Sequence, residues 1–402
     1  MPSGSTSSAR IRESLSGLAL AIYLLVGRWS PSRTFALEPS PLLEPRVWAV
    51  ALLVGLALAP RTRDPGPASP ELPAWWSASL LAQLGLWAWT ASAATWSPAG
   101  ELALGLELLD VALMVAVTLA LHRLVLVSDP LALVESLERG LIGLLVALAL
   151  LALAGGLAAS RMAALGGGPN VFGRNMGLLC VLALHRAMAV PRARDMVLAL
   201  LAAGLVALSG SRGAMAATAL AGAALISFGR ARPSRRVLVL SAALIGALLV
   251  LGTTEIGQVV IDRIRVRVID LLLGRGYVSN RDRIYVVAIE LGLSAPIFGQ
   301  GLGSFAVATP WPYAHDLVLD AWAETGLIGV LLLLVALAVL GLGLLTQRWR
   351  RVDGLAAAAL LMGVASLFSG GRYDARGLWC LATLALLVPL RVPRRPSMRR
   401  PP

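Results

Sequence analysis

His315 is the side chain of this sequence best placed to act as a base. It ends a polar, arginine-rich segment, residues 253–316, that interrupts an otherwise almost continuously apolar chain. The other two histidines, His122 and His185, lie near the ends of apolar runs, each beside an arginine. An imidazole has a pKa near neutral pH, so His315 can take a proton from a hydroxyl group. The alternative interpretation is a hydrogen-bonded histidine at the start of a helix.

Several arginines predicted to face outwards, among them Arg212 and Arg174, are candidate partners for an anion. Arg212 stands where two apolar runs meet with hardly a loop between them. A charge at a membrane edge is costly and is usually paired or functional, although a snorkelling side chain at a helix end is the alternative. Guanidinium groups bind phosphate oxygens in forked pairs. Together with His315, these arginines suit a reaction with an anionic leaving group such as a pyrophosphate.

The polar segment is expected to be helical. Residues 257–273 show a helical pattern and are expected to lie on the outer membrane surface. A second helix is expected to open near Arg281 and to end at Pro296. On that helix Arg281 and Tyr285 are four residues apart and share a face. Arg283 points elsewhere on the helix, so it is the weaker candidate for the same anion.

No metal site and no cofactor site is predicted. The chain has two cysteines, Cys180 and Cys380, both in apolar runs and interpreted as buried thiols. A single outward histidine without a cysteine cluster does not form a zinc site. The alternating glycines 299, 301 and 303 are compatible with a phosphate loop, but no strand precedes them. We interpret them as a tight bend that lets two backbone segments pack closely.

Composition identifies a polytopic membrane protein. Of the 402 residues, 57% are hydrophobic and 14% are charged, whereas soluble domains have about 25% charged residues. The formal net charge is +13, with arginine as the basic residue. These charges are scattered over many short loops, which is not the pattern of a nucleic-acid-binding protein. The excess of positive charge on cytoplasmic loops of membrane proteins accounts for them.

Apolar runs predict an all-α fold of about 12 transmembrane helices. The predicted spans are residues 15–27, 46–60, 74–92, 101–121, 140–159, 173–190, 195–210, 213–229, 237–252, 316–345, 354–369 and 377–391. The first is interpreted as a retained span, not a cleaved signal peptide. The predicted parts are membrane spans 1–9 (1–252), an extracytoplasmic segment (253–315), spans 10–12 (316–391) and a basic cytoplasmic tail (392–402).

The distribution of arginines predicts the orientation. With both termini in the cytoplasm, about 21 arginines face inwards and about 8 outwards when the long segment is left out. Long loops are excluded because they cross a membrane largely regardless of charge. Both termini are therefore expected in the cytoplasm, and the segment 253–316 on the extracytoplasmic face. The outward arginines run against this bias, which is why they are candidate functional residues.

Several motifs together resemble the bacterial O-antigen ligase and O-antigen polymerase superfamily of polytopic membrane glycosyltransferases. His315-Asp316 is followed, after nine residues, by a Gly-x-x-Gly element that begins at Gly326. Other matching elements are Ser211-Arg212-Gly213, Arg281 and Tyr285 ahead of Pro296-Ile297-Phe298-Gly299-Gln300-Gly301, Pro169-Asn170-Val171-Phe172-Gly173-Arg174-Asn175, and Trp96-Ser97-Pro98. The resemblance covers roughly residues 75–335.

The resemblance implies a reaction and residue roles. Members transfer a glycan from an undecaprenyl diphosphate carrier to an acceptor hydroxyl on the outer face of the bacterial inner membrane, without a metal. It implies that His315 is the base and that Arg212 and Arg281 hold the diphosphate. Asp316, Tyr285 and Glu324 are supporting candidates. Asp316 stands where Asn, Ser or Gln is usual, and we expect its carboxylate to raise the pKa of His315. Tyr285 stands where Trp is common.

The expected function is therefore a metal-independent, inverting membrane glycosyltransferase. Its expected partners are the lipid-linked glycan donor, a glycolipid, glycan or protein acceptor, and the bilayer itself. Ligase, polysaccharide polymerase and protein O-oligosaccharyltransferase share these parts, so the choice among them stays open. The alternative from another class is a transporter or flippase of lipid-linked sugars, which would carry charges inside spans and paired half-repeats. Glu107 and Asp110 are the clearest mid-span ionisable residues.

Overall fold

A computed structural model describes residues 7–26, 40, 43–60, 74–154, 162, 168–228, 258, 281–346 and 352–391, and these are helical with connecting turns. The first half of the described chain contains α1 (Ser7–Val26), α3 (Pro45–Leu58), α4 (Ala74–Ser92), η2 (Ala93–Trp96), α5 (Glu101–Val127), α6 (Pro130–Ala154) and α7 (Pro169–Ala189). The second half contains α8 (Ala193–Ser209), α9 (Arg212–Phe228), α12 (Arg281–Ser294), α13 (Ser304–Ala308), α14 (Leu317–Thr346), α15 (Asp353–Ser366), η5 (Tyr373–Ala375) and α16 (Arg376–Arg391). The all-α prediction is confirmed for these residues.

Each predicted apolar run that lies within the described residues coincides with a helix. The run 237–252, the predicted helix 257–273 and the tail 392–402 lie outside the described residues. Four helices in the described part are long and apolar enough to cross a membrane, namely Glu101–Val127, Pro130–Ala154, Leu317–Thr346 and Tyr373–Leu390. Three further apolar helices are shorter: Pro45–Leu58, Arg212–Phe228 and Asp353–Ser366. The protein is thus an integral membrane protein, and the number of twelve spans stays a prediction.

Local sequence accounts for the helix boundaries. Proline stands in the first turn of α3 and α7, where it has no backbone hydrogen bond to lose. The carboxylate of Asp129 caps α6 by accepting hydrogen bonds from the amides of Leu131 at 3.0 Å and Ala132 at 3.3 Å. Gly210 ends α8 in the left-handed conformation, with a φ of 64°. This sharp end lets α9 begin two residues later.

Small residues set how closely the helices pack. A Cβ atom on Gly17 of α1 would lie 2.6 Å from the Ser136 side chain of α6, and one on Gly140 would lie 3.3 Å from Ala21. Such small-residue contacts are the usual way in which membrane helices approach. The largest fully buried side chains include Trp379, Tyr23 and Phe172. Trp379 of α16 packs edge-on against Trp87 of α4, and Tyr23 of α1 packs edge-on against Tyr373 of η5.

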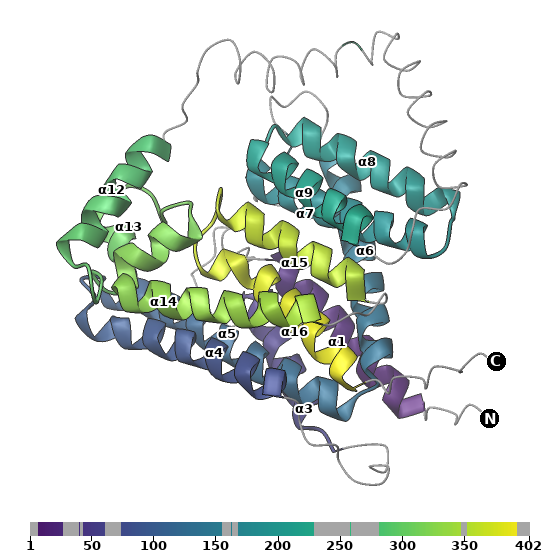
Figure 1. Ribbon diagram of the computed structural model, residues 1–402, viewed down its shortest axis with the longest axis horizontal. Helices are drawn as coiled ribbons and strands as arrows, with labels where there is room; N and C mark the ends of the chain where they lie inside the picture. Colours follow the sequence, from purple (N-terminus) through teal and green to yellow (C-terminus); the bar gives the residue numbers. More distant parts are fainter. Residues whose placement is uncertain are drawn as a thin grey trace, which may run out of the picture.

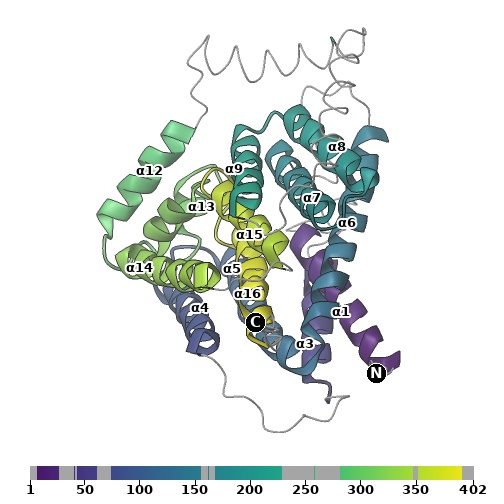
Figure 2. The same ribbon diagram turned by 45° about the vertical axis from the view of Figure 1, so that its right-hand side comes forward.

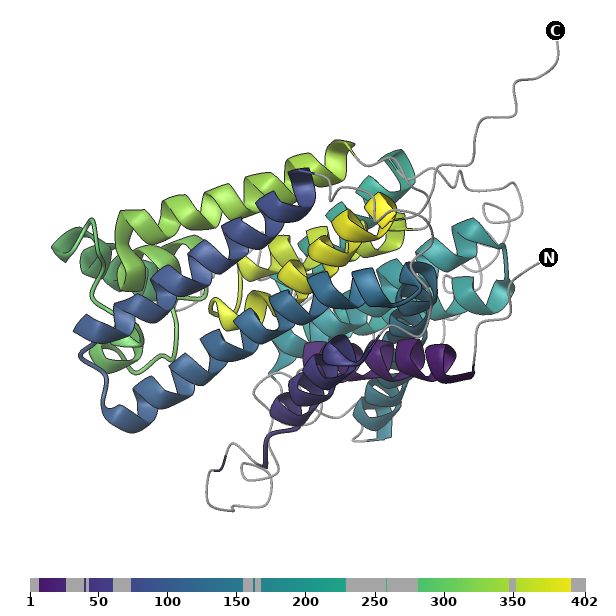
Figure 3. The same ribbon diagram turned by 90° about the horizontal axis from the view of Figure 1, so that it is seen from below.

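Two groups of helices pack against α16 (Figure 1). In the first, α8 and α9 pack on α7, and α7 and α9 pack on α15, which contacts α16. In the second, α4 packs between α5 and α14. In Figure 2, α16 lies near the centre, with α4 and α14 to its left and α1 and α6 to its right. Seen from below, α4, α5 and α14 run side by side, and the green segment with α12 and α13 lies at one end of them (Figure 3).

The helix ends predicted to face outwards contact one another at that end. The connection after α4 meets the segment before α13, because Leu302 donates a backbone hydrogen bond to the carbonyl of Ala93 at 3.1 Å. The start of α7 meets the end of α15 through Arg174, whose side chain donates to the carbonyl of Ser369 at 3.3 Å. The ends predicted to face inwards also meet, since the amide of Asp129 donates to the carboxylate of Glu13 at 3.0 Å.

Candidate active site

His315 lies in a turn between α13 and α14, in an unusual backbone conformation. Its φ of 60° is the one positive value at a non-glycine residue in the described chain, and such a conformation costs about 1–2 kcal/mol for most residue types. The imidazole is half-buried and packs edge-on against the ring of Tyr313, with centroids 4.6 Å apart. Its Nδ1 atom is buried and has no hydrogen-bond partner among the described residues.

The charges around His315 favour its neutral form. Burial lowers the pKa of His315 below the ordinary value, the Arg281 guanidinium lowers it further, and the carboxylate of Asp374 opposes both effects. A neutral imidazole is the form that accepts a proton. Arg281 also places a cation near the base, although the two residues are 34 positions apart in the sequence.

Helix α12 places Arg281 near His315 and Tyr285 near Asp316. Burial raises the pKa of Tyr285, the Arg281 guanidinium opposes that effect, and the carboxylate of Asp316 adds to it. Both residues are half-buried, whereas Arg283 is exposed on another face of α12. The structure therefore separates Arg281 from Arg283, in the way that their spacing on a helix predicts.

Asp316 has a different role from the expected one. Its carboxylate accepts hydrogen bonds from the amides of Val318 and Leu319, both at 2.9 Å, and so caps the start of α14. The expectation that Asp316 raises the pKa of His315 is wrong, because the carboxylate with that effect is Asp374 and the net direction is downward. Asn and Ser, two of the residue types that are usual at this position in the superfamily, are also good helix caps.

Arg174 reaches the same region from α7. Its side chain is only 6% exposed and donates a hydrogen bond to the carbonyl of Ser369. It also interacts electrostatically with Asp374 and Tyr313. Because Tyr313 stacks on His315, Arg174 belongs to the group of residues that surrounds the base.

Arg212 opens α9 at the same end of the protein. The Ser211 hydroxyl caps this helix by accepting a hydrogen bond from the amide of Ala214 at 3.4 Å. A Cβ atom on Gly213 would lie 2.6 Å from the Cβ of Phe368, so only glycine lets α9 approach the end of α15 here. In the Ser211-Arg212-Gly213 element, the serine thus caps α9, the arginine is a half-buried cation, and the glycine allows the close approach of the two helices.

The connection between α15 and α16, residues 367–375, is the part of the site that sequence reasoning missed. Arg372 within it is 8% exposed. Its Nε lies 3.3 Å from the Asp320 carboxylate, and its Nη2 donates a hydrogen bond to Glu324. Arg372 was counted among the outward arginines, but no role was assigned to it or to Asp374. The Gly370-Gly371 pair between two apolar runs is the signal that marks this connection as a tight turn.

Glu324 is a supporting residue through its contacts with protein. One carboxylate oxygen binds Arg372, and the other accepts a hydrogen bond from the amide of Phe305 at 3.4 Å. It therefore ties α14 to α13 and to the connection 367–375. A buried carboxylate of this kind needs its cation, since an unpaired charge in the interior is strongly unfavourable.

Two glycine elements join each other through their backbones. Gly326 breaks the regular geometry of α14, with a φ of 66°. The carbonyls that this break releases, those of Ala323 and Glu324, accept hydrogen bonds from the amides of Gln300 and Gly301 at 2.9 and 3.0 Å. In return, Leu327 donates to the carbonyl of Pro296 at 2.9 Å. The glycines of this turn thus allow two backbone segments to pack closely, as predicted. The contact fixes the first half of α14, which begins two residues after His315.

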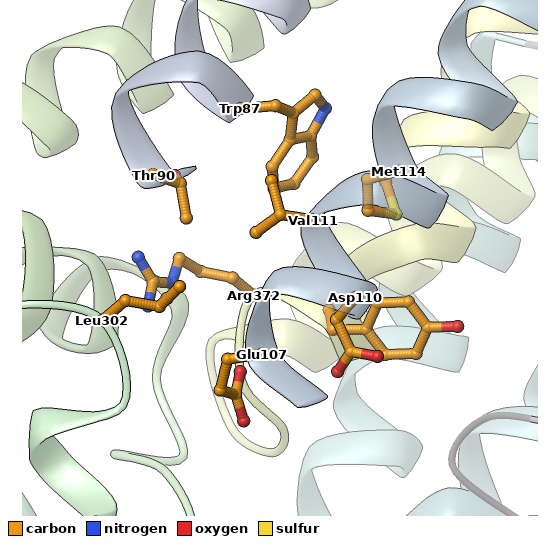
Figure 4. A pocket seen from close by; sticks show the side chains of 9 residues that line it. Trp87, Thr90, Glu107, Asp110, Val111, Met114, Leu302 and Arg372 are labelled. Atoms are coloured by element: carbon orange, nitrogen blue, oxygen red, sulfur yellow. The ribbon is translucent and has the colours of Figure 1, made fainter. Parts of the chain in front are cut away.

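A small cavity of about 20 Å³ lies below this site, among α4, α5 and the connection 367–375. Figure 4 shows the guanidinium of Arg372 turned toward Thr90 and Leu302, with Glu107 nearby. This volume suits about one water molecule. Among the described residues, no cluster of three or more His, Cys, Asp or Glu side chains is placed to hold a metal ion.

Comparison with known families identifies part of the chain. Residues 197–334 match the family model described as O-antigen ligase. This part of the chain is therefore similar to the O-antigen ligase family. The match confirms the predicted resemblance to the O-antigen ligase and polymerase superfamily of membrane glycosyltransferases. No curated protein matches the chain.

The part of the chain that matches the O-antigen ligase model contains most of the predicted site residues. Arg212, Arg281, His315 and Glu324 lie within the matched residues 197–334. Arg174, Arg372 and Asp374 lie outside them, and their membership of the site comes from the structure. The similarity to this family implies a lipid-linked glycan and a glycan acceptor as partners in the membrane. The residues around His315 thus come from the matched part of the chain together with α7 and the connection before α16.

Proposed function

We propose that the protein transfers a glycan from an undecaprenyl diphosphate carrier to an acceptor hydroxyl, on the extracytoplasmic face of the bacterial inner membrane. His315 takes the proton of the acceptor hydroxyl as that oxygen attacks the anomeric carbon. The bond from this carbon to the diphosphate oxygen breaks, and the carrier leaves as the lipid diphosphate. Attack from the opposite side inverts the configuration of the sugar.

Arginines supply the positive charge that the leaving diphosphate needs. Arg281 and Arg212 hold its oxygens, with Arg174 as a further candidate behind them. Guanidinium groups can neutralise a diphosphate without a metal, because they donate several charge-assisted hydrogen bonds at once. Interactions that strengthen as charge develops on the leaving group are the ones that accelerate the reaction.

One observation carries this proposal: the base and a diphosphate-binding cation lie at one site. Arg281 acts electrostatically on both His315 and Tyr285, and it favours the neutral form of the imidazole. The buried Nδ1 of His315 has no partner in the described part of the chain. A neutral histidine beside an arginine supports the assignment of His315 as the base and of Arg281 as a diphosphate-binding residue.

The orientation is part of the proposal. The connections predicted to face outwards meet one another around His315, while those predicted to face inwards meet at the opposite helix ends. The excess of arginines on the second set supports a cytoplasmic position for it and for both termini. Labelling of single cysteines introduced near each terminus, from outside intact cells, tests this orientation.

Substitution of the proposed site residues tests the reaction. His315→Asn suits the purpose because asparagine tolerates the left-handed backbone that His315 adopts. Loss of a general base is expected to lower the transfer rate by about 10²–10⁴-fold. Arg281→Ala and Arg212→Ala are expected to abolish surface glycan as well. Arg283→Ala is the matched control, because this arginine is exposed on another face of α12. Normal surface glycan in all three site variants, at normal expression, would overturn the mechanism.

The products distinguish the members of the superfamily and the alternative class. Purified protein with a lipid-diphosphate-linked glycan is given a glycolipid, a glycan or a protein acceptor. One transfer to a glycolipid indicates a ligase, a ladder of chain lengths indicates a polymerase, and a modified protein indicates an O-oligosaccharyltransferase. Movement of the labelled carrier across proteoliposomes without a covalent product would indicate a transporter. The same assay in excess chelator tests whether a metal is required.

A further inference from the structure

One side of α12 is apolar and uncovered, although this helix belongs to the polar segment of the chain. Val286, Ile289 and Leu293 are 53%, 38% and 62% exposed. The opposite side is packed on α14, where a Cβ atom on Gly292 would lie 2.7 Å from the ring of Trp322. The orientation of α12 is thus set by close packing, and its apolar side faces away from the protein. Proteins in water rarely expose a contiguous apolar surface of this kind.

The apolar surface continues beyond the end of α12. Ile297 and Phe298 are 53% and 55% exposed. The ring of Phe298 packs against two tryptophans, with centroid distances of 6.0 Å to Trp89 and 6.3 Å to Trp96. Tryptophan clusters are typical of the zone where a membrane meets water. This aromatic cluster lies between α12 and the ends of α4 and α14.

The same surface joins the membrane-facing side of α14. Ile328 of α14 donates a backbone hydrogen bond to the carbonyl of Ile297 at 3.3 Å, so the two segments touch. From this point exposed residues follow α14 at helical spacing, with Leu327 at 51%, Leu331 at 52% and Val335 at 52% exposure. Because α14 is long and apolar enough to cross a membrane, this stripe faces lipid. The surface of α12 is a continuation of a lipid-facing surface.

Charged residues border the apolar side of α12. Arg283 and Glu290 are exposed on the neighbouring face of the helix, and Asp282 is exposed in the first turn, on the side of Val286. Helices that lie in the plane of a membrane surface have an apolar side in the acyl boundary and a charged side toward water. A water-exposed lid would instead carry polar residues at Val286 and Leu293.

We propose that α12 is an interfacial helix whose apolar side, Val286, Ile289 and Leu293 with Ile297 and Phe298, is embedded in the lipid bilayer. The partner of this surface is the bilayer lipid itself. The placement brings Arg281, at the start of α12, to the level of the lipid headgroups. A diphosphate attached to a membrane lipid lies at that level too. The inference concerns the position of α12 and does not depend on the reaction proposed for His315.

Spin labels at single cysteines test the placement. Cys180 and Cys380 are replaced by alanine, and single cysteines are introduced at Val286, Leu293 and Phe298 in lipid nanodiscs. Arg283 and Glu290 are the control positions on the charged side. Labels at the three apolar positions are expected to collide several-fold more often with oxygen, which dissolves in lipid, than with a water-soluble nickel chelate. The two control positions are expected to show the reverse ratio.

A second measurement needs no change to the native cysteines. A benzophenone amino acid at Leu293 or Phe298 is expected to crosslink to lipid, which mass spectrometry detects as a lipid adduct. Ready collision of the nickel chelate with the three apolar positions would show that α12 stands clear of the membrane and would overturn the proposal. Protection from both collision reagents, or crosslinks to protein, would show that a second copy or another part of the chain covers this side. That result would overturn it as well.

Discussion

The carboxylate of Asp320 joins the backbone beside His315 to the connection before α16. One oxygen accepts a hydrogen bond from the amide of Ala314 at 3.3 Å, and the other accepts one from the amide of Arg372 at 3.3 Å. Ala314 is fully buried and directly precedes the strained backbone of His315. A residue in a sparsely populated conformation persists only where its surroundings hold it there. Asp320 is one of the groups that hold His315.

Asp320→Asn is therefore expected to impair catalysis through His315. The amide places an N–H group where one of the two acceptors stood, so one backbone amide loses its partner. Hydrogen bonds to charged groups contribute about 1.5–3 kcal/mol, and a loss of that size in the transition state lowers the rate by about tenfold to a hundredfold. We expect kcat to fall while KM changes little, as measured in nanodiscs with a lipid-linked donor.

The pH dependence separates positioning from a change of charge. Asp320 is not among the groups that shift the pKa of His315, so the acid limb of the Asp320→Asn profile is expected to match that of the wild type. Glu101→Gln is the control, because Glu101 is an exposed carboxylate in the first turn of α5. Wild-type kcat in Asp320→Asn would show that this hydrogen bond does not position the base.

Arg372→Ala is expected to destabilise the folded protein. It leaves the carboxylates of Asp320 and Glu324 buried without their cation, and breaking a buried ion pair in this way costs about 3–5 kcal/mol. Thermal unfolding in detergent measures the effect. Arg139→Ala is the control, since its pair with Glu135 is exposed and such pairs contribute little.

The double variant Arg372→Ala with Glu324→Gln tests the assignment of the loss to unpaired charge. Removing one of the two carboxylate charges should restore part of the stability that Arg372→Ala loses, so the two changes should not add. An unfolding midpoint for the double variant below that of Arg372→Ala would contradict this explanation.

The membrane helices could be predicted because their signals are local. Apolar runs such as 74–92 and 195–210 coincide with α4 and α8 because a lipid environment leaves a helix as the available way to satisfy the backbone. The predicted run 316–345 coincides with α14 as well, but its break at Gly326 was not predicted.

The pairing of distant segments could not be predicted in the same way. Hydropathy shows which residues enter the membrane, but it does not show which outer connections touch. The roles of Arg372 and Asp374 depend on the approach of residues 367–375 to α14, some fifty residues away in sequence. Asp316 was misread because its nearest charged neighbour in sequence was taken for its partner, whereas its carboxylate bonds to the helix that follows.

The transfer rate is expected to stay high below the ordinary pKa of histidine. The neutral imidazole is the active base, and burial with Arg281 lowers the pKa of His315. Activity should therefore fall only when the pH drops through this lowered pKa, which is below about 6.5. Asp374→Asn removes the carboxylate that opposes the lowering and should move the acid limb to still lower pH. If the rate of the wild-type protein already falls above pH 6.5, the pKa of His315 is not lowered and this explanation is wrong.

Removing the charge of Arg281 is expected to shift the acid limb in the opposite direction. Arg281→Gln removes a cation near His315, so the pKa of His315 should rise and the acid limb should move to higher pH. Arg281→Lys keeps the charge and should leave the limb near its wild-type position while weakening donor binding, because lysine lacks the forked geometry. Rates at saturating donor over a range of pH measure both variants. Equal limbs in Arg281→Gln and Arg281→Lys would show that Arg281 does not act on the base.

Gly326→Ala is expected to prevent correct assembly of the site. The glycine has a φ of 66°, and an added Cβ would collide with the carbonyl oxygen of Ile297. The left-handed conformation alone costs about 1–2 kcal/mol for a residue with a side chain. The collision would also separate the hydrogen-bonded backbones of α14 and residues 296–301.

Gly341→Ala in the same helix is the matched control, because nothing lies within 4 Å of its added Cβ. Fluorescence-detected size exclusion after heating compares the two variants. Equal loss of the folded peak would show that the break at Gly326 is not needed for the fold.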